Sequence, residues 1–220
     1  MNPSAVRDRN RTLLRRLVDT FTVLLVIIGF VAVGYVLLHV GRSPLPQPTP
    51  ASDYATTGVT APPRSALPSS LPTRLTIPAI GAQSALTEVG LNADGTPGVP
   101  SGATVDEAAW LKTSVTPGQT GTSIIVGHVD TLKSGSSVFY RIGRLAPGTL
   151  IRVQRQDGKT AVFTVTAVRS YDKTAFPSAL VYGQSGTPVL RLITCSGDWD
   201  AQSHQYTQNL VVFSSLTSVE

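Results

Sequence analysis

An apolar segment of 23 residues, Val18–Val40, constrains this chain more than any other feature. Apart from Asp19 and His39 near its ends, its only ionisable side chain is that of Tyr35. As a helix it would be roughly 34 Å long, enough to cross a hydrocarbon core of ~30 Å. A cleaved signal peptide is the alternative, but its apolar core is usually only ~7–15 residues long. No Ala-x-Ala cleavage site follows the segment, so we predict an uncleaved transmembrane helix over residues 18–40.

The basic residues around this segment predict its orientation. Five arginines lie in the first 16 residues, whereas the flank after the segment carries only Arg42. Cytoplasmic flanks of membrane helices are enriched in Lys and Arg. Residues 1–17 are therefore expected to be a basic cytoplasmic tail of a single-pass plasma-membrane protein, and everything after residue 41 is expected to be extracellular.

The net charge of +5 comes mostly from that tail. From Arg42 onward there are 13 basic and 11 acidic residues, so the rest of the chain is close to neutral. Nucleic-acid binding requires a clustered basic surface. No nucleic-acid partner is expected.

Residues 41–70 are predicted to be a Pro-rich extracellular linker. Eight of the 16 prolines fall within residues 42–72, among Ser, Thr and Ala and few large apolar residues. Such a composition buries too little apolar surface to offset its ordering entropy, and proline favours extended polyproline II. The segment is typical of a semi-rigid stalk, and residues 71–220 are expected to form the folded domain.

The domain itself shows many short strand-like runs and little helix. The runs are 74–80, 84–91, 108–112, 122–130, 149–168, 187–195 and 209–216, separated by Gly, Pro, Asp and Ser. The 149–168 run contains Asp157-Gly158, which is typical of a type I′ hairpin turn. Residues 136–145 have apolar side chains at helical spacing and predict one short helix. This pattern favours an all-β fold, a closed or nearly closed β-barrel.

Cys195 is the only cysteine in the chain, and it follows the apolar run VLRLIT. An exported protein meets an oxidising environment, yet a lone cysteine has no internal disulfide partner. Three interpretations remain open: a small buried apolar residue, a disulfide to another chain, or a reactive thiol at a strand tip. A reactive thiol needs a group that takes its proton or stabilises its anion.

Among the three histidines, only His128 has a comparable position. It ends the apolar run SIIVG, whereas His39 lies at the membrane edge and His204 in a polar stretch. Two strands ending in His128 and Cys195 would place both side chains at one rim of a barrel. Without a second cysteine or a closely spaced histidine pair, no metal or other cofactor is expected.

Several segments of the domain resemble the sortases, most closely those of the actinobacterial class F. The segments are GHVD (127–130), FYRIGRLAPGT (139–149), DKTAFP (172–177), RLITCSGDWD (191–200) and the entry strand RLTIPAIG (74–81). The resemblance runs from about Leu71 to the C-terminus. It implies a closed, sortase-like β-barrel of about eight strands with one or two short helices, preceded by the membrane anchor.

The resemblance also implies a cell-surface cysteine transpeptidase. Sortases cut an LPXTG-like sorting signal between Thr and Gly, hold the acyl group as a thioester, and pass it to an amine. By motif match Cys195 is the nucleophile, and His128 is the acid/base that protonates the leaving amine. The expected partners are proteins with C-terminal sorting signals and an amine acceptor of a cell-wall precursor or a pilin. The enzyme is expected to be a monomer.

The sequence departs from the family in one respect. Sortases normally supply an arginine near the start of the last strand, to stabilise the oxyanion or position substrate. Here no Arg or Lys follows Arg191. Arg191 shares strand parity with Cys195 and is a candidate substitute, although its Cα would lie roughly 13 Å away. A surface residue in a cross-strand pair is an equal alternative for Arg191. The other candidates are His204, Gln205, Thr207 and Gln208.

Two other functions remain open at this point. A catalytically weak or silent membrane-tethered β-barrel that binds wall peptides or partners would explain the missing arginine, although His128 and Cys195 argue against it. A peptidoglycan L,D-transpeptidase is another exported Cys/His enzyme. No SHG-x-R-type sequence precedes Cys195, so this second alternative ranks lower.

Overall fold

A computed structural model of the protein describes residues 54–55 and 65–220. The predicted tail, the predicted transmembrane helix and most of the predicted linker lie outside the described residues. Among the residues that are described, no helix is long and apolar enough to cross a membrane.

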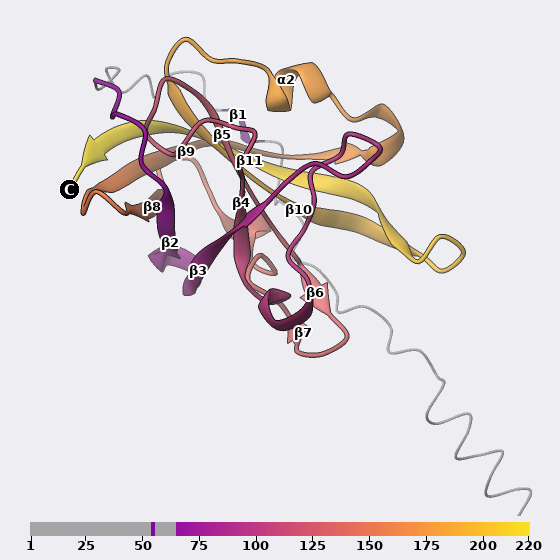
Figure 1. Cartoon of the computed structure of the whole chain (residues 1–220). Helices are drawn as coiled ribbons and strands as arrows, with labels where there is room; N and C mark the ends of the chain where they lie inside the picture. Colours follow the sequence, from indigo (N-terminus) through magenta and orange to yellow (C-terminus); the bar gives the residue numbers. More distant parts are fainter. Residues whose placement is uncertain (1–53, 56–64) are drawn as a thin grey trace, which may run out of the picture. The chain divides into compact units, whose positions relative to one another are not determined.

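Eight strands form a closed barrel, which confirms the all-β prediction (Figure 1). The order around the barrel is β9-β11-β10-β5-β4-β3-β2-β8, and β8 pairs with β9 to close it. The β3–β4 and β5–β10 pairs are parallel, and the others are antiparallel. The strands are β2 (Pro72–Ile77), β3 (Ala82–Val89), β4 (Ala108–Leu111), β5 (Gly121–Gly127), β8 (Leu150–Arg155), β9 (Thr160–Asp172), β10 (Pro188–Asp200) and β11 (Gln205–Val219).

Three shorter strands lie outside the barrel order. β1 (Tyr54–Ala55) pairs with β9 opposite Ala167 and Val168. β6 (Asp130–Thr131) and β7 (Gly135–Ser136) form a separate two-stranded ribbon directly after His128. The segment that follows a predicted functional residue is therefore itself ordered by backbone pairing.

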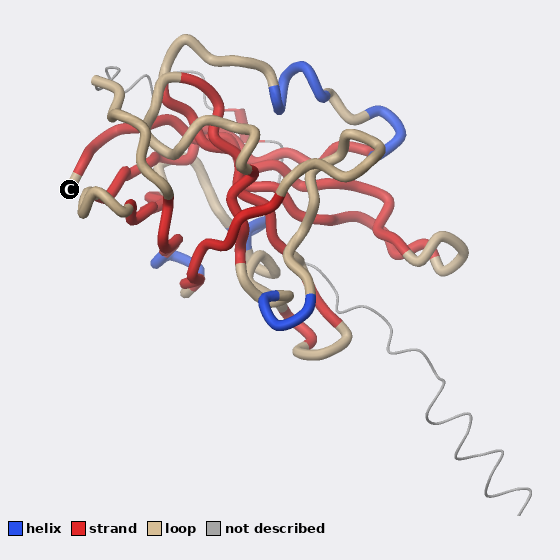
Figure 2. The backbone as a smooth tube through the Cα atoms, viewed as in Figure 1, coloured by secondary structure: helices blue, strands red, loops and turns tan. Residues whose placement is uncertain are grey.

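Helical structure is sparse, as the sequence predicts (Figure 2). The described residues contain one α-helix, α2 (Ser178–Tyr182), and four 3₁₀ turns: η1 (Pro78–Ile80), η2 (Gly102–Thr104), η3 (Ile142–Arg144) and η4 (Lys173–Ala175). The 136–145 segment forms only η3 rather than a helix along its length. Val138, Ile142 and Leu145, the residues at helical spacing, nevertheless pack in or against the core, so core packing explains their spacing.

The predicted hairpin around Asp157-Gly158 is confirmed, but its type I′ turn is not, because that turn needs a positive φ at both central residues and Asp157 has a negative one. β8 and β9 pair antiparallel up to Gln154 and Thr160, and Gly158 has a φ of +78°. That left-handed conformation is readily available to glycine and costly for residues with a side chain.

The strands of the barrel separate two apolar clusters. The larger one fills the barrel and includes Ile125, Leu192 and Val212. The second includes Ile124 and Ile193 on the other face of β5 and β10, together with Val181 of α2. Successive side chains of a strand point to opposite faces. β5 is therefore buried on both faces, which explains its continuous apolar run.

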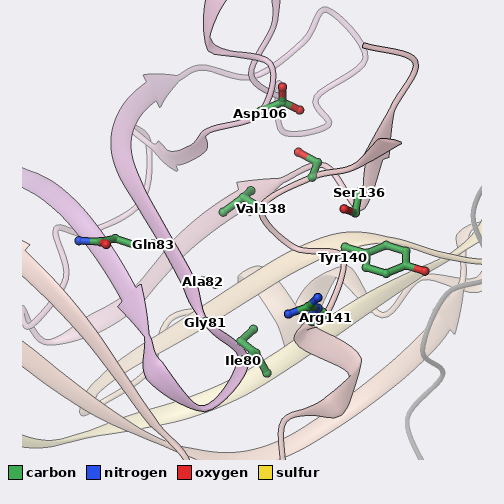
Figure 3. Close-up of a pocket in the computed structure, with 10 residues that line it drawn as sticks. Ile80, Gly81, Ala82, Gln83, Asp106, Ser136, Val138, Tyr140 and Arg141 are labelled. Atoms are coloured by element: carbon green, nitrogen blue, oxygen red, sulfur yellow. The ribbon is translucent and has the colours of Figure 1, made fainter. Parts of the chain in front are cut away.

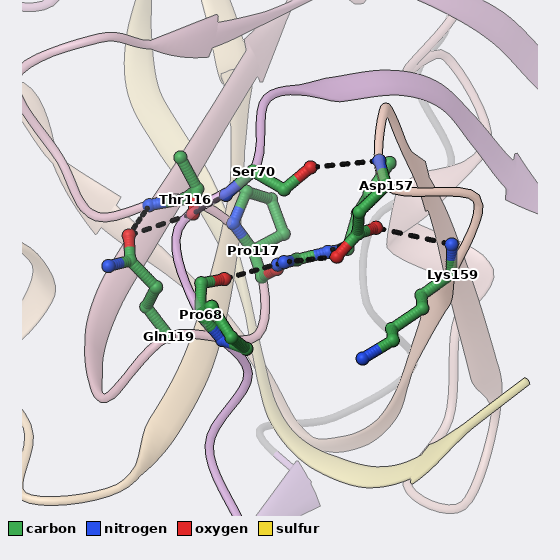
Figure 4. A network of polar contacts seen from close by, with 8 residues as sticks. Pro68, Ser70, Thr116, Pro117, Gln119, Asp157 and Lys159 are labelled. Carbon is green, nitrogen blue, oxygen red and sulfur yellow. Dashed lines mark hydrogen bonds and ion pairs between the residues drawn. The ribbon is translucent and has the colours of Figure 1, made fainter.

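The end of the predicted linker belongs to the folded domain. Four hydrogen bonds attach it to the barrel: Leu67 N–H to the Gly118 carbonyl (2.8 Å), Ser70 N–H to Thr116 Oγ1 (3.1 Å), Arg155 Nη2 to the Pro68 carbonyl (2.6 Å), and Asp157 N–H to Ser70 Oγ (3.1 Å). Figure 4 shows the bonds of Pro68 and Ser70. Three of the four linker groups are backbone N–H or carbonyl groups, so the composition of the linker gives no sign of these bonds. The folded part begins a few residues before Leu71.

Arg155 is the centre of this attachment. Its side chain is buried, and it also donates to the Pro117 carbonyl and pairs with Asp157 at 3.0 Å. The carboxylate of Asp157 neutralises the guanidinium of Arg155, and the two carbonyls accept its N–H groups. Without these partners, burial of the charge would be costly.

Replacing Arg155 with methionine should lower the free energy of unfolding by about 2–4 kcal/mol, because two carbonyls lose their charged donor. Urea unfolding of the full chain measures the change. Arg152→Met is the matched control, since Arg152 forms only a partly exposed pair with Glu220 at 3.5 Å, and a loss under about 1 kcal/mol is expected. Equal losses in the two variants would contradict a central role for Arg155.

Candidate active site

Cys195 and His128 come from neighbouring strands of the barrel. β5 and β10 pair in parallel up to Val126 and Ile193, which both belong to the outer cluster. Cys195 lies two residues after Ile193, and His128 lies two residues after Val126. Because side chains alternate, both continue the same row on the outer face. The register therefore places these two sequence-predicted residues at the same end of the β5–β10 pair.

Two hydrogen bonds fix the chain on either side of His128. Thr194 Oγ1 donates to the Gly127 carbonyl at 2.8 Å, and Tyr206 OH donates to Asp130 Oδ2 at 2.6 Å. The first ties the chain to β10 and the second ties it to β11. His128 is thus held from both sides beside the strand that carries Cys195.

Gly127 is required for packing next to this histidine. A Cβ atom at Gly127 would lie 2.8 Å from Cδ2 of Phe139, a side chain with no exposed surface. A larger residue would have to displace a core phenylalanine. The small residue before His128 therefore accommodates the ring of Phe139.

The imidazole of His128 has a defined hydrogen bond. Its Nε2 lies 2.9 Å from the carbonyl oxygen of Pro100. A carbonyl can only accept, so Nε2 carries the proton and Nδ1 is the nitrogen left to take one. Among the described residues, no hydrogen bond joins this ring to the Cys195 thiol. Catalytic contacts of this kind often tighten only when substrate binds.

The strand that carries Cys195 does not end there, which corrects the interpretation of Cys195 as a strand tip. β10 continues to Asp200 and pairs with β11, with a register shift between Ser196 and Trp199. Gly197 lies in this shift with a φ of +81°, and a Cβ there would lie 2.7 Å from Thr207 Oγ1. A β-bulge that only glycine fits, rather than a strand end, redirects the chain beside the thiol.

The thiol of Cys195 is free and half-buried. Burial raises its pKa, and the charge of Asp130 raises it further. The ammonium of Lys173 opposes both effects, because it hydrogen-bonds the sulfur and attracts negative charge. The balance still favours the neutral thiol, so a proton acceptor is needed for attack at neutral pH.

Arg191 shares the face of Cys195, as its strand parity predicts, but its guanidinium packs elsewhere. Its Cζ lies 4.6 Å from the centroid of the Phe213 ring, and Nη1 donates to the Leu190 carbonyl at 3.3 Å. Burial lowers the pKa of Arg191 to about 10, and Nε has no hydrogen-bond partner in the described structure. These are the contacts of a side chain that packs in the outer cluster.

The other candidate substitutes for the family arginine have different contacts. Gln205 accepts a hydrogen bond from Lys173 at 3.5 Å, and Gln208 donates to Asp172 at 2.7 Å. Thr207 Oγ1 accepts from the N–H of Asp198 at 3.1 Å. His204 is exposed in the β10–β11 turn, with its ring 6.4 Å from that of Trp199.

Replacing Arg191 with methionine should leave stability unchanged or raise it by up to about 2 kcal/mol, because a buried charge without a carboxylate partner is removed. The lowered pKa means that the fold disfavours the charged form, so this cost is fully present below pH about 10. Thermal unfolding at pH 7 measures it. If Arg191 instead stabilises the oxyanion, the variant will lose ~10²-fold or more in kcat/KM.

Two cavities lie near the barrel surface. One, of about 220 Å³, lies between the β2–β3 corner and residues 136–141, with Asp106 at its edge (Figure 3). Another, of about 210 Å³, lies beside Tyr182 over Leu111 and Ile124 of the outer cluster. Neither is lined by Cys195 or His128. In the part of the chain that the structure describes, no group of three His, Cys, Asp or Glu side chains could hold a metal ion.

A closed barrel that presents a cysteine and a histidine from adjacent strands is the framework of an enzyme with a thiol nucleophile. The family model of the sortase domain matches residues 75–217 of this chain. The chain therefore belongs to the sortase family, which consists of cysteine transpeptidases.

Solved structures of sortases share the fold at low sequence identity. Sortase A from Corynebacterium diphtheriae is 19% identical with a TM-score of 0.52, over 71% of this chain and 64% of that one. Sortase A of Listeria monocytogenes is 18% identical with a TM-score of 0.50, over 70% of this chain and 90% of that one. A pilus-related sortase C of Group B Streptococcus is 15% identical with a TM-score of 0.50, over 68% of each chain. The comparison with curated proteins finds no match.

Proposed function

We propose that this sortase cleaves an LPXTG-like sorting signal through a thioacyl intermediate on Cys195 and transfers the protein to an amine. The observation that carries the proposal is the place of Cys195 on β10 and of His128 directly after β5, at the same end of this parallel pair, inside a sortase domain. The acceptor is an amine of a cell-wall precursor or a pilin. The motifs GHVD and RLITCSGDWD support class F as its subgroup.

The chemistry follows from the two side chains. His128 accepts the thiol proton at Nδ1, and the sulfur attacks the carbonyl carbon of Thr in the signal. His128 then returns that proton to the departing glycine amine, which leaves the acyl group as a thioester. In the second half, the acceptor amine attacks the thioester, its proton passes to His128, and the thiolate of Cys195 is released.

The proposed setting is the outer face of the plasma membrane. The apolar segment 18–40 anchors the chain, residues 1–17 remain in the cytoplasm, and a stalk within 41–70 carries a monomeric catalytic domain, 71–220. The support is the sequence: the arginines lie before the apolar segment, and the prolines after it.

A mass measurement of the intact protein tests the proposal. The full chain in detergent is mixed with a library of sorting-signal peptides, and an adduct equal to the acyl half of one peptide is expected on Cys195. Addition of an amine should then release the adduct as a new amide. A wild-type protein that binds such peptides but never acylates would support the silent, membrane-tethered binder instead.

A further inference from the structure

We propose that Lys173 is the cation that stabilises the ionised form of Cys195, in a site to which β11 contributes no arginine. The inference concerns the nucleophile of the proposed function and rests on that function for its catalytic meaning. Lys173 comes from η4, the 3₁₀ turn that directly follows β9, and not from the strand where the family cation is expected.

Sheet register places Lys173 at the thiol. Asp172 at the end of β9 pairs with Gln208 of β11, and Gln208 pairs with Ser196 of β10. The side chains of Gln208 and Asp172 are also hydrogen-bonded at 2.7 Å. Asp172 thus lies in the same row as Ser196, the residue after Cys195. Lys173 directly follows Asp172 and is held next to that row. From there, the ammonium of Lys173 reaches the sulfur.

Gln205, the first residue of β11, also binds this ammonium. Its Oε1 lies 3.5 Å from Lys173 Nζ. Lys173 thereby links η4 to the start of β11. Its side chain is half-buried, which strengthens its effect on a neighbouring charge relative to a solvated lysine.

The other charges near the sulfur do not supply this effect. Asp130 on β6 is negative and opposes ionisation of the thiol. Cys195 pairs with Asn209 of β11, which is neutral. Asn209 in turn pairs with Tyr171 of β9. His128 follows β5 and is the proton acceptor in the proposed mechanism. Arg191 packs over Phe213, four residues away along β10.

A cation in this position favours two negative species. It lowers the cost of the thiolate before attack, and the thiolate is again the leaving group when the acceptor amine displaces the acyl group. Lys173 is thus a positioning and electrostatic residue for both half-reactions. A structural role alone would leave the ionisation of the thiol unchanged.

The test is the pH dependence of Cys195 alkylation by iodoacetamide, which needs no sorting peptide. In the full chain, Lys173→Met should slow alkylation at pH 7.5 by about tenfold, the scale of one charge-assisted hydrogen bond. Its rate should rise only at higher pH than in wild type. Lys173→Arg keeps the charge and should stay within a few-fold of wild type.

Lys112→Met is the matched control, because Lys112 is exposed after β4, at the end of the sheet opposite to His128. Its profile should match that of wild type. An unchanged profile for Lys173→Met would overturn the inference, as would an equal shift in Arg191→Met. Far-UV circular dichroism identifies variants that do not fold, and Lys173→Gln then replaces Lys173→Met.

The two proposals fail in distinguishable ways. If Lys173→Met shifts the alkylation profile but wild type forms no acyl adduct, the electrostatic role of Lys173 stands and the sorting function fails. If wild type acylates with an unshifted profile in Lys173→Met, the function stands and this inference fails. In the expected case, Lys173→Met also lowers kcat/KM for peptide cleavage about tenfold or more, and Lys173→Arg restores it.

Discussion

Replacing Cys195 with alanine is expected to abolish both peptide cleavage and formation of the acyl adduct. The sulfur is the only thiol in the chain, and the charge of Lys173 acts on it. Loss of a nucleophile that acts together with a general base costs on the order of 10⁶ in kcat. Single-turnover cleavage of a fluorogenic sorting peptide measures the loss, and intact mass reports the adduct.

The fold should survive this substitution. Cys195 is half-buried at the outer face, so removing one sulfur should cost only about 1 kcal/mol. Ser123→Ala is the matched control, because Ser123 lies buried on neighbouring β5 and its hydroxyl has no hydrogen-bond partner among the described residues. That variant should keep full activity. If Cys195→Ala unfolds the domain and wild type never acylates, the cysteine is a structural core residue.

The sequence was sufficient for the strands of the barrel, because their patterns depend on local properties. A β-branched run such as SIIVG is buried on both faces wherever it pairs, and Asp157-Gly158 turns the chain through its own backbone preference. The two apolar runs that precede Cys195 and His128 were also sufficient to predict that both residues lie at one rim of the barrel. This prediction required only that their two strands be neighbours, which the parallel β5–β10 pair fulfils.

The parts that the sequence did not reveal depend on contacts between distant segments. Lys173 precedes the cysteine and lies in a turn, so a search for a cation after Arg191 could not find it. Its only signal was its place in DKTAFP. The bulge at Gly197 depends on Thr207 across the hairpin, and the attachment of residues 67–70 depends on Arg155. Neither follows from local composition.

Arg191 shows the limit of parity arguments. Parity correctly placed it on the face of Cys195, but it says nothing of the direction in which a long side chain extends. Phe213 of β11 pairs directly with Arg191, and its ring offers a nearby surface for the guanidinium. The face was therefore predictable from the sequence, whereas the contact was not.

Replacing His128 with glutamine is expected to lower kcat for peptide cleavage by about 10²–10⁴-fold, the usual contribution of a general acid/base. Glutamine is the informative choice because its side-chain amide can still donate to the Pro100 carbonyl, as Nε2 of His128 does. It cannot take a proton at neutral pH. The loop should therefore keep its place while proton transfer is lost, and iodoacetamide should still alkylate the thiol.

The leaving group separates this role from a structural one. An amine must be protonated to depart, whereas the thiolate released from a thioester substrate departs without a proton. His128→Gln should therefore acylate from a thioester analogue of the sorting signal far closer to the wild-type rate than from the amide. Wild type should show a bell-shaped dependence of kcat/KM on pH, which reports the Cys–His pair as a unit, and the variant should lose one limb. Equal losses on both substrates would instead mean that His128 does not act on the leaving group, and that its role is to take the thiol proton or to shape the site.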